Sequence, residues 1–95
     1  MFARITHYKM KPESRDAATE LLNSLRDQIM GMPGMHHFVN VMNKDGSGYV
    51  ISVVESEEAS NANAGKVAEL WGNFSAYLEG PPKAEGYDVI ANWSK

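Results

Sequence analysis

Residues 35–55 read MHHFVNVM-NKDGSG-YVISVVE, two runs of β-branched and large apolar residues on either side of a short polar segment. The two apolar runs have the composition of β-strands. The Asp45-Gly46 pair between them supplies the positive φ that a tight hairpin connection needs. The stretch therefore predicts two antiparallel strands, over residues 35–42 and 49–55, joined directly by a hairpin.

Both sides of this hairpin carry apolar side chains, because the side chains of a strand alternate between its two faces. In the first strand of the hairpin, Phe38 and Met42 point to one face and Val39 and Val41 to the other. In the second strand, Val50 and Val54 point opposite to Ile51 and Val53. A face left uncovered would expose an apolar patch on the order of several hundred Å², more than a monomer usually tolerates. We therefore predict a homodimer in which two sheets pack face to face. The alternative is a monomer that tolerates a few exposed valines.

The flanking segments predict the remaining elements. We expect a strand over residues 2–10 and a helix over residues 13–32 with Ser14 as its N-cap. Ser56 is expected to begin a second helical region, weak up to residue 65 and regular from there to residue 78. A last strand is expected over residues 87–93. The order βαββαβ predicts an α+β fold, a ferredoxin-like two-layer sandwich with two helices on one face of a four-stranded antiparallel sheet.

Length, charge and composition exclude several classes of protein. A chain of 95 residues supports one domain, over residues 1–95. The net charge of −3 provides no basic surface for a nucleic acid. Without cysteine there is no disulfide, thiolate metal site or thiol nucleophile. The chain has no apolar run of membrane-spanning length and no signal-peptide pattern, so we expect no membrane partner and a cytoplasmic location.

The element order βαββαβ also occurs in RNA-recognition domains. Gly48-Tyr49-Val50-Ile51 faintly echoes their third-strand motif. However, Ser47 and Ile51 stand where that motif has a basic and an aromatic residue. We therefore expect no nucleic-acid partner.

Several short motifs resemble the antibiotic-biosynthesis-monooxygenase family. Pro33-Gly34 leads into a strand, a glycine-containing hairpin follows, and the next strand ends in Val54-Glu55-Ser56-Glu57-Glu58-Ala59. The opening Thr6-His7-Tyr8-Lys9-Met10-Lys11-Pro12 before a helix fits the same pattern. The resemblance covers nearly the whole chain. It implies a dimeric α+β barrel with the helices outside and a ligand cleft between sheet and helices. The family includes cofactor-independent oxygenases of polyphenols, haem-degrading enzymes and isomerases of small aldehydes or sugar phosphates.

The chain departs from this family at the positions that carry its known chemistries. The quinone-forming oxygenases have an Asn and a Trp on the third strand, where this chain has Val50 and Val54. The haem-degrading members have an Asn on the first strand and a Trp and a His in the second helical region. Thr6, Asn63 and Asn73 stand at those places here. Because the axial histidine is missing, we expect no haem. The sequence has no nucleotide or flavin motif, so we expect no other cofactor either.

Three histidines are candidate chemical groups. A histidine that faces a cleft could act as a general base near neutral pH, so His36 and His37 are the candidate catalytic residues. Neighbouring strand residues point to opposite faces, so at most one of the two would line the cleft. The alternative is a solvated histidine beside a turn. His7 is expected on the side of its strand that faces the barrel interior, and no carboxylate at recognisable spacing predicts a metal site.

Five further residues are candidates for binding a substrate. Arg4, Thr6 and Tyr8 share one face of the first strand, where Arg4 could bind an anionic group and the hydroxyls could donate hydrogen bonds. Asn40 is a polar residue within an apolar strand, and if buried it needs a partner such as a ligand. Trp71 could stack on a flat ligand. The alternatives are an exposed Arg4 and packing roles for Tyr8 and Trp71.

Two classes of function follow. The first is a small dimeric enzyme, similar to cofactor-independent monooxygenases, that acts on a small compound such as an aromatic one in the sheet–helix cleft. The second is a non-catalytic dimeric barrel that binds a small molecule or has a stress-related role.

Overall fold

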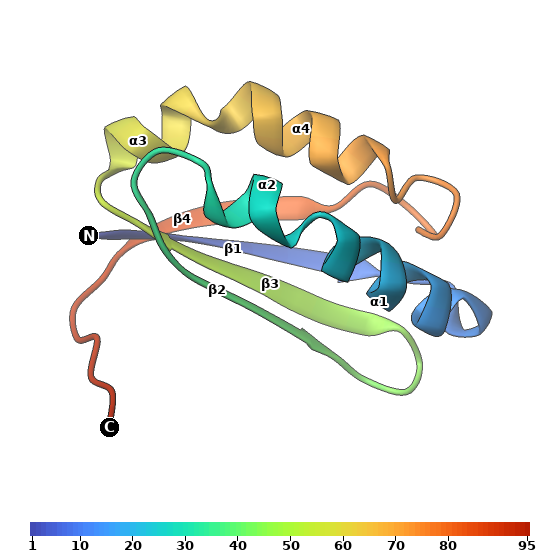
Figure 1. The fold of residues 1–95 in the computed structure, drawn as a ribbon. Coiled ribbons are helices and arrows are strands. Elements are labelled where there is room, and N and C mark those ends of the chain that lie inside the picture. Colours follow the sequence, from blue (N-terminus) through green and yellow to red (C-terminus); the bar gives the residue numbers. More distant parts are fainter.

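The computed structural model describes residues 1–95 as a four-stranded antiparallel sheet with helices on one of its faces (Figure 1). The strands are β1 (Phe2–Lys9), β2 (Met35–Met42), β3 (Ser47–Val54) and β4 (Lys83–Asp88). The helices are α1 (Arg15–Ser24), α2 (Arg26–Met30), α3 (Glu57–Ala62) and α4 (Ala64–Gly72), and a short 3-10 helix, Pro12–Ser14, precedes α1. The strand order in the sheet is β2-β3-β1-β4. The predicted ferredoxin-like α+β fold is therefore confirmed.

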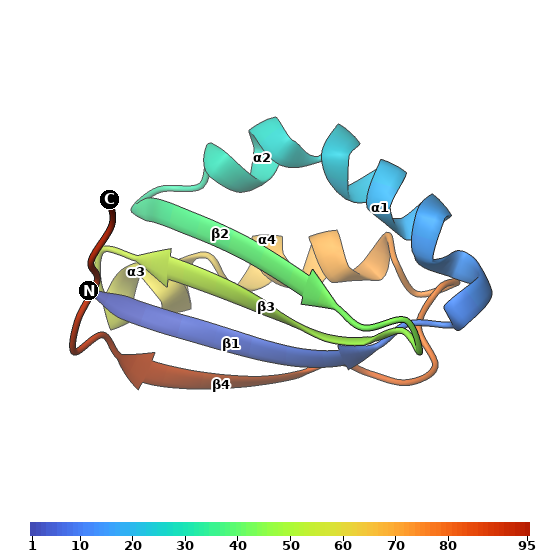
Figure 2. The ribbon, with the colours of Figure 1, turned by 90° about the horizontal axis from the view of Figure 1, so that it is seen from below.

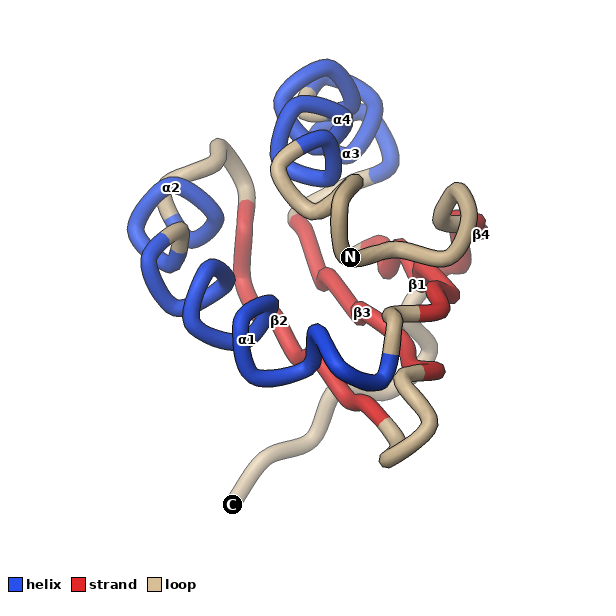
Figure 3. Tube along the Cα trace, turned by 90° about the vertical axis from the view of Figure 1, so that its right-hand side faces the viewer, coloured by secondary structure: helices blue, strands red, loops and turns tan.

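The helices form two pairs that lie on the same side of the sheet (Figure 3). The pair α1–α2 meets the sheet through α2 and β2, and the pair α3–α4 meets it through α3, β1 and β3. The core between these layers contains Tyr8, Met10, Ala18, Leu25, Ile29, Met32, Val50, Leu70 and Phe74. None of these helices has both the length and the apolar character that crossing a membrane requires.

The central hairpin forms as its sequence predicts, although β3 begins at Ser47, two residues earlier than expected. Gly46 adopts a φ of 92° in the connection. Its carbonyl oxygen accepts a 2.7 Å hydrogen bond from the backbone N–H of Met10, which fastens the hairpin tip to the end of β1. The tip is thus held in the sheet by its own backbone.

The opposite side of the sheet, named here the open face, carries no helix (Figure 2). Val39, Val41 and Tyr49 lie on it with 49%, 46% and 47% of their surfaces exposed, and Ile51 and Val53 are half-buried there. His7 is also exposed there, with its ring centroid 4.8 Å from that of Tyr49. Val50 and Val54 on the other face are buried, so apolar side chains lie on both faces of β3, as predicted.

Both helical regions are broken, although the first was expected to be one continuous helix and the second to be regular beyond residue 65 as far as residue 78. The first breaks at Leu25, where the Ser24 hydroxyl donates a 2.6 Å hydrogen bond to the carbonyl oxygen of Leu21. A serine that bonds back to its own helix in this way commonly bends it. The expected side-chain cap at Ser14 is not made.

The second helical region does begin at Ser56, whose hydroxyl accepts a 3.1 Å hydrogen bond from the backbone N–H of Ala59. It breaks at Asn63, as its weak composition predicts, but regular helix ends at Gly72 and not at residue 78. Beyond it, the backbone N–H of Glu79 donates to the carbonyl oxygen of Lys9, so this segment pairs with the end of β1 instead of continuing the helix.

The last strand was predicted too late in the chain. It was expected over residues 87–93, but β4 runs from Lys83 to Asp88. Asp88 pairs with Phe2, the first residue of β1, so the sheet offers almost no partner beyond that point. The strand begins directly after Pro82, because a proline has no N–H to donate to a sheet. Pro82 therefore determines the start of β4, and the beginning of β1 determines its end.

The glycine at the hairpin tip provides a test of this fold. Replacing Gly46 with alanine should lower the free energy of unfolding by about 1–3 kcal/mol, because φ is positive there. The new Cβ would also lie only 1.9 Å from the carbonyl oxygen of Met10. Gly65→Ala is the matched control, since nothing lies within 4 Å of its added Cβ and α4 should gain up to about 1 kcal/mol. Urea denaturation measures both, and equal effects would contradict the role of Gly46.

Candidate functional site

A pocket of about 280 Å³ lies between the sheet and the two helix pairs. It is lined by 24 residues, 17 of them hydrophobic. Strands β1, β2 and β3 form its floor, and residues of α1, α3 and α4 form much of its walls. An apolar cleft with a few convergent polar groups is the usual form of a small-molecule site.

Alternation along β1 places three polar side chains in this pocket. Arg4, Thr6 and Tyr8 point toward the helices and line the pocket, whereas His7 points to the open face. Thr6 and Tyr8 are buried and Arg4 is half-buried. Because β1 pairs with β3 on one side and β4 on the other, its backbone is held along its whole length. The three side chains therefore project from a rigid part of the sheet.

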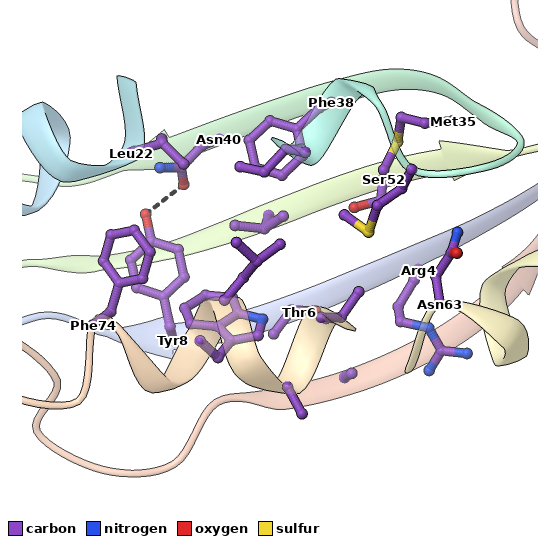
Figure 4. Close-up of a pocket in the computed structure, with 18 of the residues that line it drawn as sticks. Arg4, Thr6, Tyr8, Leu22, Met35, Phe38, Asn40, Ser52, Asn63 and Phe74 are labelled. Carbon is purple, nitrogen blue, oxygen red and sulfur yellow. Dashed lines mark hydrogen bonds between the residues drawn. The ribbon is translucent and has the colours of Figure 1, made fainter. Parts of the chain in front are cut away.

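Tyr8 and Asn40 meet at one end of the pocket (Figure 4). The Tyr8 hydroxyl donates a hydrogen bond of 2.6 Å to Asn40 Oδ1 and also lies 3.1 Å from the carbonyl oxygen of Val41. Burial raises the pKa of the Tyr8 phenol above its usual value, and the Asn40 hydrogen bond and the charge of Arg15 act in the opposite direction. Asn40 is exposed rather than buried, and its partner is a side chain of the same site.

Arg4 lies at the other end of the pocket, beside Asn63 and Ser52 (Figure 4). Its Nε donates a 2.8 Å hydrogen bond to the hydroxyl of Ser60, a buried residue of α3. Asn63, also buried, donates through its side-chain amide to the carbonyl oxygen of Pro33 at 2.9 Å. The Arg4 bond ties β1 to α3, and the Asn63 bond ties the loop before β2 to the junction of α3 and α4. Both contacts fix the polar end of the pocket.

Aromatic rings form one wall of the pocket. The Trp71 ring lies 5.7 Å from that of Tyr8 and 6.1 Å from that of Phe74, in tilted and edge-on arrangements. Phe38 lines the pocket from β2. Such a wall offers both ring faces and ring edges to a flat ligand.

The two candidate histidines are not among the residues that line the pocket. The pairing of β2 with β3 contains an irregularity, because Met35 pairs with Val54 and His37 with the next residue, Val53. His36 is thus an extra residue in the strand, as in a β-bulge. It is exposed, and its Nε2 lies 2.5 Å from Glu55 Oε2. This hydrogen bond holds the pKa of Glu55 below its usual value.

No three histidine, cysteine, aspartate or glutamate side chains gather in a way that could hold a metal ion. No aspartate, glutamate or histidine lines the pocket either. Glu57 and Glu58 occupy the first turn of α3, where carboxylates favour a helix N-terminus. The titratable side chains of the pocket are therefore the guanidinium of Arg4 and the phenol of Tyr8.

The structure thus brings together five of the seven predicted site residues: Arg4, Thr6, Tyr8, Asn40 and Trp71. It adds Ser52, Ser60 and Asn63, which sequence reasoning did not select. A signal was available for Ser52, because it lies between the buried Val50 and Val54 on the same face of β3. Ser60 and Asn63 have helical spacing, but they lie in the segment of weak helical composition.

Tyr8 provides a pH-dependent test of the site. Because the pKa of its phenol is raised in the folded protein, its contribution to stability is complete below the unfolded value near 10.0 and is lost as pH rises through the folded value. The free energy of unfolding should therefore fall more between about pH 8 and about pH 11 in the wild type than in Tyr8→Phe. Tyr8→Phe should also cost about 0.5–1.5 kcal/mol near neutral pH through the lost hydrogen bond. Parallel pH dependence in both proteins would contradict this burial of the phenol.

Comparisons with known proteins were made by sequence and by structure. No protein-family model and no curated protein matches the sequence. Among solved structures, a monooxygenase from Streptomyces coelicolor in complex with nanaomycin D is 24% identical, with a TM-score of 0.78 over 99% of this chain and 91% of that one. A protein of unknown function from Nitrosomonas europaea is 19% identical, with a TM-score of 0.82 over 99% and 93%. An antibiotic biosynthesis monooxygenase is 16% identical, with a TM-score of 0.77 over 96% and 100%.

These similarities extend over nearly the full length of each chain, at identities that establish a shared fold. The resemblance drawn from the motifs around Pro33-Gly34 and Glu55-Ser56 is confirmed at this level. The chain has the fold of the antibiotic biosynthesis monooxygenases.

Proposed function

We propose that this protein binds a small, flat, largely apolar compound in the sheet–helix pocket and oxygenates it without a resident cofactor. The observation that carries the proposal is the pocket itself, an apolar cavity of about 280 Å³ with an aromatic wall and a polar group at each end. The similarity to a monooxygenase solved with nanaomycin D supports an organic ligand on this scaffold. Arg4, Thr6, Tyr8, Asn40 and Trp71 are the proposed binding residues.

The second candidate is a protein that binds such a compound without transforming it. One observation favours this alternative. A general base for proton removal is usually a histidine or a carboxylate, and neither lines the pocket. In the enzymatic case the ligand must therefore be acidic enough to lose its own proton to water.

Oxygen consumption by protein treated with a chelator tests the first proposal. Addition of a naphthalenediol should produce oxygen uptake above the rate without protein, and Trp71→Ala should reduce it at least about tenfold through loss of ring contacts. The matched control is Trp93→Ala, because Trp93 is exposed and does not line the pocket.

The variant His36→Ala/His37→Ala decides whether these exposed histidines take part. We expect it to keep most of the oxygen uptake, because neither side chain lines the pocket. Binding of the diol without oxygen uptake, detected by thermal shift, would leave the second candidate as the function.

We further propose that two copies associate through their open faces. Val39, Val41 and Tyr49 leave about half of their surfaces uncovered, and Ile51 and Val53 lie between them on the central strand β3. The segment after β4 leaves the domain on the side of the sheet away from the helices (Figure 1) and carries Ile90 and Trp93, each more than 90% exposed. Covering these side chains would yield roughly 25 cal/mol per Å² before the cost of association.

Charge on the open face tests the association. Val41→Lys should shift the protein from dimer to monomer at micromolar concentration, because an ammonium group buried between apolar sheets lacks a partner. Met30→Lys is the matched control, since Met30 is an exposed apolar residue of α2. Light scattering after size-exclusion chromatography measures the mass. A folded wild-type monomer under these conditions would refute the dimer.

A further inference from the structure

The two ends of the pocket differ in charge. Tyr8 and Asn40 form a neutral hydrogen-bonded pair at one end, and Arg4 brings a permanent positive charge to the other (Figure 4). Between the ends the lining is largely hydrophobic. A ligand that fits this arrangement has an apolar body with one charged end.

Arg4 has no acidic partner in the protein. The ion pairs of the structure join Lys9 to Glu79 and His36 to Glu55, and neither involves Arg4. A guanidinium has five N–H donors, and the side-chain hydrogen bond of Arg4 uses only its Nε, toward Ser60. The terminal nitrogens are therefore available. A half-buried cation without a counter-ion is costly to desolvate, and an anionic group that pairs with it offsets that cost.

The guanidinium is also held in place. The bond to Ser60 anchors it to α3, and its central carbon lies 5.9 Å from the centre of the Phe2 ring on the same strand. A donor fixed before binding loses less entropy when the ligand arrives.

We propose that the pocket selects anions: its ligand is an aromatic carboxylate whose acid group pairs with Arg4 while its ring system lies against Trp71. This assignment rests on the proposed function, because it concerns the same pocket. A carboxylate matches the fork of a guanidinium and accepts two parallel hydrogen bonds from it. The cavity of about 280 Å³ suits a system of one or two rings.

A pair of probes with one shape and different charge tests the proposal. Calorimetry on the full chain compares 2-naphthoate with the neutral 2-naphthamide. The wild type should bind the acid at least about tenfold more tightly than the amide. Arg4→Gln should bring the two affinities to within about twofold by weakening the acid alone. Arg26→Gln, at an exposed position of α2 outside the pocket, should keep the wild-type preference.

A further variant keeps the test valid if Arg4→Gln does not fold. Arg4→Lys retains the charge but not the fork, so it should reduce the preference for the acid without abolishing it. Equal affinity of the wild type for acid and amide would overturn the anion selectivity and leave the pocket's function standing. Failure of folded wild-type protein to bind either probe would count against the proposed function as well.

Discussion

The hydrophobic core of this chain and the wall of its pocket are largely the same side chains. Eight of the nine core residues line the cavity, and Leu25 is the exception. Helix pairs that closed fully on the sheet would fill this space, so the fold retains a cavity at the expense of its own packing. The pocket is partly open to solvent, so a ligand can enter it without the chain unfolding. A ligand that fills the space binds the folded chain and not the unfolded one, and so stabilises the fold.

Strand β1 connects this core to the chemistry of the site. It is an inner strand, paired on both sides, and its alternation sends Arg4, Thr6 and Tyr8 to the pocket and His7 to the open face. A shift of one residue in its register would exchange the two sets. The bond from Met10 to the glycine tip and the pairing of Phe2 with Asp88 hold both ends of the strand. The same pairing that organises the sheet thus determines which side chains reach a ligand.

The parts of the structure that follow local rules could be predicted from the sequence. The hairpin, the shared face of Arg4, Thr6 and Tyr8, and the cap at Ser56 depend on turn geometry, alternation and short-range hydrogen bonds. The parts that depend on distant partners could not. The extra residue at His36 arises in the pairing of β2 with β3, and the C-terminal end of β4 is determined by where β1 begins. The chemistry of imidazole predicts His36 as a site residue, and nothing local predicts Ser60, which reaches Arg4 across 56 residues of chain.

The pocket lacks a base and carries a positive charge at one end. Both features bear on how a ligand bound there would lose a proton. Without a histidine or carboxylate, the pocket cannot take a proton from a weakly acidic ligand, and Tyr8, with its raised pKa, stays protonated near neutral pH. Arg4 carries a positive charge, and in a cleft of low polarity such a charge lowers the pKa of an acid bound beside it. In the proposed complex the acid beside Arg4 is the ligand's carboxylate, which is ionised near neutral pH in any case and whose charge cancels that of the guanidinium. A phenol or enol elsewhere on the ring therefore gains little from this charge, so Arg4 serves recognition and the oxidised ligand must be acidic enough to ionise by itself.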